Sequence, residues 1–232
     1  VLNNVSSSYP QGTKQRNDNY LKKIEGMVFG DSEESGIRRG SEFYHGPLDL
    51  YMSSANSWEI INTPNSLIFN APFGEAVLQM TLEDLNFREK PEEYLKRFAQ
   101  NVLEEEDLSI NGFKGYSVKA IQSGKTTRMA VIFKQNQVYQ FIGYLKDERS
   151  DFAKFDIEFQ EIIKSFRKLN EDEITYSKPL RISSYKVRKG DTYRSLALKS
   201  SININAEDQL RLINGDYPNK PLSEGRIIKI IE

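Results

Sequence analysis

"TTRMAVIFKQNQVYQFIGYLK" (residues 126–146) contains two apolar stretches separated by the turn residues Gln135-Asn136. β-Branched and aromatic residues dominate both stretches, and Asn favours the left-handed backbone that a tight hairpin requires. The segment therefore predicts an antiparallel β-hairpin. A third strand is predicted in "GFKGYSVKAI" (112–121), which a turn at Ser123-Gly124 joins to the hairpin.

A helix is predicted after the hairpin, because the apolar period there changes from two residues to about 3.6. Ser150 is the expected N-cap of this helix. Its apolar face is rich in aromatic residues, namely Phe152, Phe155, Phe159, Ile162, Ile163 and Phe166. We expect this face to pack on the sheet.

Four more strands and a second helix are predicted before the hairpin. The strands are "PLDLYMS" (47–53), "SWEIINT" (57–63), "NSLIFNAP" (65–72) and "EAVLQMTLED" (75–84). The helix is predicted in "KPEEYLKRFAQNVLEEE" (90–106), where apolar residues recur at helical spacing. The expected fold class is α+β, with an antiparallel sheet of about six or seven strands and helices packed on one face.

The order of the elements divides the chain into two domains. The α+β domain is expected to cover residues 40–169, followed by a polar linker at 170–180. Residues 1–39 are poor in apolar side chains and are predicted to be a linker or the remnant of an upstream domain. The last unit, 181–232, has the predicted order strand, helix, helix, strand, and carries ten Lys or Arg against six Asp or Glu.

Composition excludes several classes of function. The 232 residues carry a formal net charge of −1, so no field recruits a nucleic acid and none is expected as a partner. Cysteine is absent, which excludes disulfides and cysteine nucleophiles, and His45 is the single histidine. Because zinc hydrolases use two or three His ligands, we predict no catalytic and no metal site in this chain. No apolar run approaches the roughly 20 residues that span a bilayer, so no transmembrane segment is expected.

Isolated chemical signals have simpler structural explanations. "SGKTTR" (123–128) lacks the first glycine of a phosphate-binding loop and precedes a strand, so a hairpin turn is favoured. "LEEEDLS" (103–109) lacks the spacing of a calcium loop, which favours a solvated helix end. His45 is predicted to make a structural hydrogen bond, and Trp58 to anchor the core.

The C-terminal unit carries the strand "YKV" (185–187), the turn Gly190-Asp191-Thr192 and the later run Leu212-Ile213-Asn214. It resembles a LysM module, a βααβ fold that binds N-acetylglucosamine-containing glycans such as peptidoglycan. Further matching residues are Leu196, Ala197, Leu222, Gly225, Ile227, Ile228 and Ile230. The segment "KSSININAEDQ" (199–209) departs from the family because it is a few residues longer than usual.

The LysM resemblance implies a glycan groove between the turn and the loop "NGDYPNK" (214–220). The implied glycan-binding residues are Gly190, Asp191, Thr192, Tyr193, Asn214, Gly215, Asp216 and Tyr217. Tyr193 and Tyr217 would stack on sugar rings, and Asp191, Asn214 and Asp216 would bond hydroxyl groups. Helix capping by Asp191 or Thr192 and a sharp turn at Gly190 explain the same residues without a ligand.

A longer pattern begins with "NYLKKIEGMVFGDSEESGIRRGSEFYHGPLDLYM" (19–52), in which Gly26, Gly30-Asp31, Gly36, Gly40 and His45 are the specific part. It continues in "APFGEAVLQM", "KPEEYLKRF", "SINGFKGY" and "SFRKLNEDE". The chain resembles the C-terminal half of BepA-like bacterial envelope zinc metallopeptidases, and its middle is similar in outline to PsbP-like α+β domains. In that family a HExxH helix upstream of this region holds the zinc. The resemblance implies zinc in an upstream peptidase domain, and no cofactor or catalytic residue here.

The leading hypothesis is a non-catalytic C-terminal region of an envelope zinc metallopeptidase, with a regulatory, substrate-selecting or anchoring role. Its expected partners are its own upstream peptidase domain and peptidoglycan or envelope proteins. Its expected location is the cell envelope, either periplasmic or lipid-anchored. The alternative is a freestanding peptidoglycan-binding protein. A third hypothesis, a hydrolase, requires two carboxylates about 5–10 Å apart in a cleft.

Overall fold

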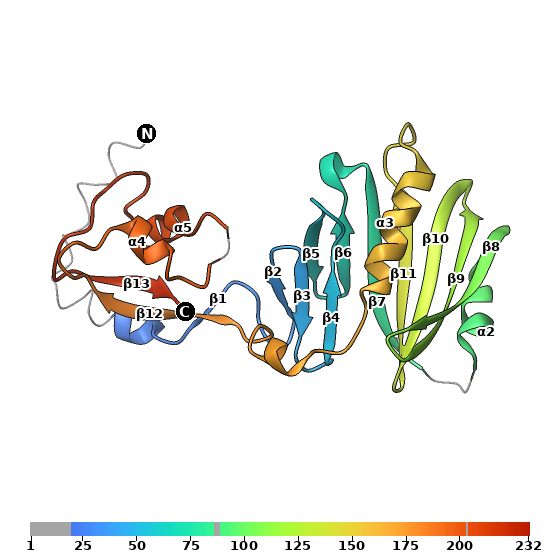
Figure 1. The fold of residues 1–232 in the computed structure, drawn as a ribbon, viewed down its shortest axis with the longest axis horizontal. Coiled ribbons are helices and arrows are strands. Elements are labelled where there is room, and N and C mark those ends of the chain that lie inside the picture. The colour runs from blue at the N-terminus through green and yellow to red at the C-terminus, as the bar shows by residue number, and fades with distance from the viewer. Residues whose placement is uncertain (1–19, 86–88, 203) are drawn as a thin grey trace. The chain divides into compact units, whose positions relative to one another are not determined.

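A computed structural model describes residues 20–85, 89–202 and 204–232 of the protein. The chain forms two compact units (Figure 1). The large unit is Glu33–Lys178, and the C-terminal unit combines residues 20–32 with Pro179–Glu232. Much of the sequence expected to form linkers, at 1–39 and 170–180, therefore belongs to the compact units. Residues 1–19 lie outside the described part of the chain.

The large unit is built on an antiparallel sheet that, within the described residues, has seven strands in the order β5-β6-β7-β11-β10-β9-β8. Their bounds are β5 (Glu59–Thr63), β6 (Ser66–Asn70), β7 (Ala76–Asp84), β8 (Val102–Ile110), β9 (Phe113–Gln122), β10 (Lys125–Lys134) and β11 (Gln137–Leu145). β10 and β11 form the predicted hairpin, with Lys134 opposite Gln137. The antiparallel sheet and its few helices confirm the α+β class.

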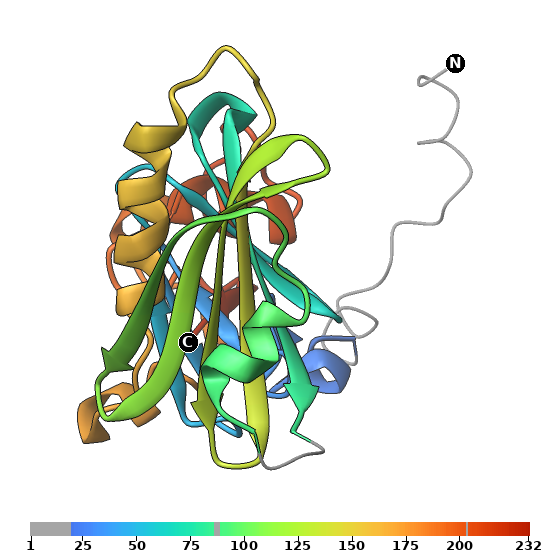
Figure 2. The same ribbon diagram turned by 90° about the vertical axis from the view of Figure 1, so that its right-hand side faces the viewer.

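Helices cover both faces of this sheet, which corrects the expected packing on one face (Figure 2). α3 (Phe152–Lys164) packs on the face of β10 that holds Ile132. α2 (Pro91–Lys96) packs on the opposite face, which holds Val131. All residues from 129 to 132 are buried, so this strand is apolar on both sides and requires cover on each.

The N-terminus of α3 is capped by Asp151 and not by the predicted Ser150. Asp151 Oδ1 accepts a hydrogen bond from the backbone N–H of Ala153 at 2.9 Å. The Ser150 hydroxyl donates instead to Glu75 Oε1 at 3.1 Å. A carboxylate at this position also interacts favourably with the helix dipole, which stabilises the same end.

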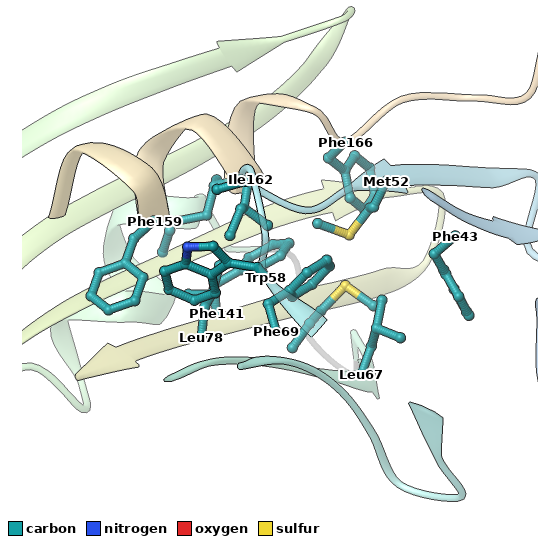
Figure 3. Packing of buried hydrophobic residues seen from close by; sticks show 14 of the residues in the cluster. Phe43, Met52, Trp58, Leu67, Phe69, Leu78, Phe141, Phe159, Ile162 and Phe166 are labelled. Carbon is teal, nitrogen blue, oxygen red and sulfur yellow. The ribbon is translucent and has the colours of Figure 1, made fainter. Parts of the chain in front are cut away.

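A second sheet packs on the core of the large unit and, in the described part of the chain, consists of three strands in the order β2-β3-β4. Their bounds are β2 (Ile37–Arg39), β3 (Glu42–His45) and β4 (Leu50–Ser53). Phe43 and Met52 bring this sheet into the same cluster as Phe159 (Figure 3). Trp58 is buried edge-on against Phe159 and donates its Nε1–H to Glu158 Oε2 at 3.1 Å, which confirms its predicted place in the core.

The predicted helix at 90–106 is wrong in its second half. α2 ends at Lys96, and residues 102–110 form β8, the strand at one edge of the sheet. Asn101 lies between them with φ 44°, a left-handed conformation that interrupts the helix. Two acidic residues of β8 form ion pairs. Glu104 pairs with Lys119, and Glu105 pairs with Lys96 at 2.9 Å. Charged side chains on both faces are typical of an edge strand, where they oppose aggregation.

The chain from 165 to 178 is fixed to the large unit, although its polar sequence predicted a linker from 170. It contains the short 3₁₀ helix η3 (Glu171–Ile174). Arg167 makes two hydrogen bonds to the Glu173 carboxylate, at 2.6 and 2.7 Å, and stacks over the ring of Tyr51 at 3.6 Å. Arg39 donates to the carbonyl oxygen of Lys178 at 2.9 Å. These contacts order a polar segment that carries few apolar side chains.

The C-terminal unit has the predicted order strand, helix, helix, strand. These elements are β12 (Leu180–Lys186), α4 (Tyr193–Ala197), α5 (Ala206–Ile213) and β13 (Ile227–Ile231). Within the described residues, β1 (Val28–Phe29) adds a third strand beside β12. This strand belongs to the region predicted as a linker, because backbone hydrogen bonds such as Gly26 N to Ile182 O hold it to the sheet. The core residues are Val187, Tyr193, Leu196, Ile202, Leu210, Ile228 and Ile231.

Candidate functional site

The turn after β12 is organised by its own side chains. Asp191 Oδ2 accepts hydrogen bonds from the backbone N–H of Arg188 at 2.7 Å and from the hydroxyl of Tyr185 at 2.9 Å. The Arg188 bond, followed by the Tyr185 bond, lowers the pKa of Asp191. Gly190 has φ 88°, which side-chain-bearing residues rarely adopt. The Asp191 hydrogen bonds and the left-handed backbone of Gly190 therefore fix the turn that precedes α4.

Thr192, and not Asp191, caps α4. Its Oγ1 accepts a hydrogen bond from the backbone N–H of Ser195 at 3.0 Å, and its own backbone N–H donates to Ser195 Oγ at 3.0 Å. This reciprocal pair is a capping box. The cap leaves Thr192 exposed to solvent.

Tyr193 and Asp216 are joined inside the unit. Tyr193 is 1% exposed, Asp216 is 0% exposed, and the tyrosine hydroxyl donates to Asp216 Oδ2 at 2.6 Å. Arg226 donates to the same oxygen at 2.5 Å, and Lys220 Nζ lies 3.2 Å from Oδ1. We call these four residues the Asp216 network. Because Tyr193 and Asp216 are buried, neither offers a surface to a sugar, which corrects the contacts expected of both.

The charges of the Asp216 network explain how a carboxylate can be buried. Burial alone would raise the pKa of Asp216, and hydrogen bonds from Tyr193, Arg226 and Lys220 oppose it, with the net result that the pKa is lowered. Burial and the hydrogen bond to Asp216 raise the pKa of Tyr193. The network therefore holds an ionised carboxylate and a neutral phenol.

Asn214 is also a structural residue. Its Nδ2 donates to the carbonyl oxygens of Leu210 and Lys229, each at 2.8 Å, and its Oδ1 accepts from the backbone N–H of Lys229 at 2.8 Å. The side-chain amide thus links the end of α5 to β13. Both N–H donors of the Asn214 side chain are engaged in the fold, so a hydroxyl contact of this half-buried residue is limited to the remaining lone pair of Oδ1.

Hydrogen bonds to Arg211 of α5 hold the loop 214–220 in place. The backbone N–H of Asp216 donates to Arg211 O at 2.8 Å, and Arg211 NH1 donates to Lys220 O at 3.0 Å. Tyr217 is 54% exposed at the crest of this loop, and Gly215 beside it is also exposed. The hydrogen bond between Tyr193 and Asp216 ties this loop to the start of α4, so the structure brings the two predicted halves of the site together.

The accessible part of the predicted site is smaller than the sequence suggested. Gly190, Thr192, Gly215 and Tyr217 are exposed, and Asp191 and Asn214 are half-buried. Tyr217 is the one member that offers an exposed aromatic ring. Arg226 and Lys220 were not predicted from the sequence. Nothing in their spacing indicates that both contact the Asp216 carboxylate, which is buried after α5.

Other candidate residues have structural roles. His45 Nδ1 accepts from the backbone N–H of Leu48 at 3.2 Å, which is the hydrogen bond predicted for it. The "SGKTTR" segment forms the turn between β9 and β10, with positive φ at Ser123 and Gly124. Among the described residues, no group of three or more His, Asp or Glu is placed to hold a metal ion. None of the helices described is long and apolar enough to cross a membrane.

No protein-family model matches this chain, and no curated protein matches it. Solved structures are similar to parts of it. Cyanobacterial PsbP (CyanoP) from Synechocystis sp. PCC 6803 has a TM-score of 0.41 and 9% identity, over 63% of this chain and 94% of its own. A protein from Bacteroides thetaiotaomicron VPI-5482 also has a TM-score of 0.41, with 14% identity, over 70% of this chain and 58% of its own.

LpqN, described as involved in cell envelope biogenesis of Mycobacterium tuberculosis, has a TM-score of 0.36 and 13% identity, over 70% of this chain and all of its own. Likenesses this distant assign neither a family nor a function to the chain.

Proposed function

We propose that the chain is a non-catalytic region of an envelope zinc metallopeptidase, and that its C-terminal unit binds an N-acetylglucosamine-containing glycan such as peptidoglycan. In this proposal the glycan anchors or positions an upstream peptidase domain, which would hold the zinc. The chain would act in the cell envelope, as part of a periplasmic or lipid-anchored enzyme.

The observation that carries the proposal is the hydrogen bond between Tyr193 and Asp216, which joins the two loops that a LysM-like glycan site requires. The loops are fixed before any ligand arrives, so binding would cost little conformational entropy. Tyr217 supplies a flat, half-exposed ring on which a sugar could stack. Asp191 and Thr192 supply oxygen atoms in the turn between β12 and α4.

A retention assay on purified peptidoglycan tests the proposal. The wild-type chain should be retained saturably, and Tyr217→Ala should weaken retention about 5- to 30-fold, the equivalent of about 1–2 kcal/mol of lost ring contact. The matched control is Phe73→Ala, which removes a fully exposed ring from the large unit. Absence of saturable retention, or equal retention of the Tyr217 and Phe73 variants, would exclude glycan binding by this site.

The anchoring role and a freestanding glycan-binding protein share this site and differ in what precedes the chain. A HExxH helix encoded upstream would support the metallopeptidase. Saturable glycan retention without such an upstream domain would favour the freestanding alternative.

A further inference from the structure

Cations flank the predicted glycan site in the C-terminal unit. Arg188 and Lys189 precede Gly190 in the turn between β12 and α4, and Arg194 is the second residue of α4. All three charged side chains are exposed. Within the described residues, none of them forms an ion pair with a carboxylate. We call Arg188, Lys189 and Arg194 the basic turn.

Asp191 lies within the basic turn, and the fold already uses its carboxylate. Its Oδ2 accepts hydrogen bonds from the backbone N–H of Arg188 and from the hydroxyl of Tyr185. These two bonds lower the pKa of Asp191, and the nearby charges of Lys199 and Arg188 lower it further. Asp191 therefore offsets part of the charge of Lys199 and Arg188, which leaves Lys189 and Arg194 unbalanced.

Glu224 is an exposed carboxylate on the loop beside the basic turn. The backbone N–H of Gly225 donates to the carbonyl oxygen of Val187 at 2.8 Å, which holds this loop against the end of β12. One carboxylate offsets one cation, and the basic turn presents both Lys189 and Arg194. The exposed site therefore keeps a surplus of positive charge.

Other carboxylates of the unit have cations of their own. Glu25 accepts a hydrogen bond from the backbone N–H of Ser184 at 2.9 Å, and Lys186 lies two residues further along β12. In the loop 214–220, Asp216 is buried and lies 3.2 Å from Lys220 Nζ. Neither carboxylate leaves a net negative charge at the predicted glycan site.

We propose that the basic turn binds the carboxylates of the stem peptides of peptidoglycan, a preference that rests on the glycan binding proposed above. Asp191 and Thr192 lie between Lys189 and Arg194 in the chain, so a sugar bound at their oxygen atoms would have these cations on either side. A guanidinium group binds a carboxylate through two parallel hydrogen bonds, and an ammonium group binds it as a point charge.

Charge selects a carboxylate-bearing glycan from the possible ligands. A neutral oligomer of N-acetylglucosamine would make no use of the unbalanced cations. A nucleic acid is disfavoured because the whole chain carries a formal net charge of −1, so its field does not recruit a long polyanion. A glycan with carboxylates on short stems uses both the sugar contacts and the local positive charge.

Isothermal titration calorimetry of the full chain with two forms of one soluble peptidoglycan fragment tests the proposal. One form keeps its free stem carboxylates, and in the other these carboxylates are converted to amides. The free form should bind about two- to fivefold more tightly, the equivalent of about 0.4–1 kcal/mol, which is within the range of an exposed ion pair. This preference should disappear in about 1 M sodium chloride, where the Debye length falls to about 3 Å.

The double variant Lys189→Glu, Arg194→Glu should abolish or reverse the preference for the free form. Arg188 is left unchanged, because its guanidinium group lies 5.9 Å from the centre of the Tyr185 ring. The matched control makes the same change of charge at exposed positions on α3 of the large unit, by Lys154→Glu and Lys164→Glu. The control should keep the wild-type preference.

Three results would overturn the proposal: equal binding of the two forms by wild type, an unchanged preference in the double variant, or an equal loss of preference in the control. Equal binding of both forms would leave the proposed glycan binding intact. Absence of binding to either form would exclude the glycan binding and this preference together. Circular dichroism of each variant excludes misfolding as the cause.

Discussion

Replacing Tyr193 with Phe would remove one hydroxyl group from the interior of the C-terminal unit. The ring is 1% exposed and would keep its packing. The hydroxyl is the donor of the 2.6 Å hydrogen bond to Asp216, so this bond is lost. Asp216 would retain Arg226 at 2.5 Å and Lys220 at 3.2 Å, and its carboxylate would therefore remain paired.

The expected cost follows from which partners remain. A hydrogen bond to a charged group contributes about 1.5–3 kcal/mol, and the lower end applies here because Asp216 still forms ion pairs with Arg226 and Lys220. We therefore expect Tyr193→Phe to lower the free energy of unfolding by about 1.5–2 kcal/mol. Asp216→Ala leaves the buried Tyr193 hydroxyl without a partner and leaves Arg226 with the carbonyl oxygen of Asn214 at 3.1 Å but without its carboxylate. Breaking a buried ion pair costs about 3–5 kcal/mol, and the partial exposure of Arg226 places this variant near about 3 kcal/mol.

The measurement must report on the C-terminal unit alone. Trp58 is the single tryptophan of the chain and lies in the core of the large unit, so its fluorescence follows the other unit. Hydrogen exchange of the α4 and α5 amides, measured in urea, reports the C-terminal unit. Tyr217→Phe is the matched control, because it removes an exposed hydroxyl and should change stability by less than about 0.5 kcal/mol. The reasoning is refuted if Tyr193→Phe also costs less than about 0.5 kcal/mol, or if the Trp58 transition shifts equally.

Three further predictions concern the large unit. Gly143→Ala should destabilise it by about 1–3 kcal/mol in urea unfolding, since a Cβ atom there would lie 2.8 Å from the Phe159 ring; an unchanged midpoint would contradict this. Asp156→Ala should lower the free energy of unfolding by about 3–5 kcal/mol, because Arg128 makes two 2.6 Å hydrogen bonds to that carboxylate and both residues are buried. A decrease of less than about 1 kcal/mol would be inconsistent with a buried ion pair. Burial lowers the pKa of His45, so its contribution to stability is present above about pH 6.5 and is lost as the pH falls toward the folded-state value. Trp58 fluorescence should show wild type losing more stability between about pH 7.5 and 5 than His45→Gln, and equal losses would exclude this role.

The sequence was most informative where local and long-range preferences agree. The segment 126–146 became β10 and β11 because its β-branched and aromatic residues suit strands. The left-handed position of its two-residue turn is Gln135, with φ 57°, and not the Asn136 that the sequence favoured. The stripe from Phe155 to Ile163 became the buried face of α3 because its apolar spacing suits a helix. In these elements the local pattern and the final burial indicate the same structure.

The sequence was misleading where tertiary pairing overrides local pattern. Residues 102–106 were predicted to be helical because Val102 and Leu103 continue an apolar helical stripe, but in β8 they gain hydrogen bonds and ion pairs from β9 that a helix would not provide. The packing of α2 and α3 on opposite faces depends on strand order, which the apolar run in β10 leaves open. Tyr193 and Asp216 are 23 residues apart, and their contact has no local signal.

Burying the charged Asp216 network is unfavourable for the folding stability of so small a unit. This cost supports a role of the network in positioning the exposed loop 214–220. Replacing a whole buried ionic network with apolar residues of similar volume is often neutral for stability. The triple variant Tyr193→Phe, Asp216→Leu, Arg226→Met should therefore unfold within about 1–2 kcal/mol of wild type. If the network serves to hold Tyr217 in place, this variant should nevertheless lose peptidoglycan retention about as strongly as Tyr217→Ala. Full retention in a folded triple variant would show instead that the network is structural and that glycan binding does not require a preformed loop.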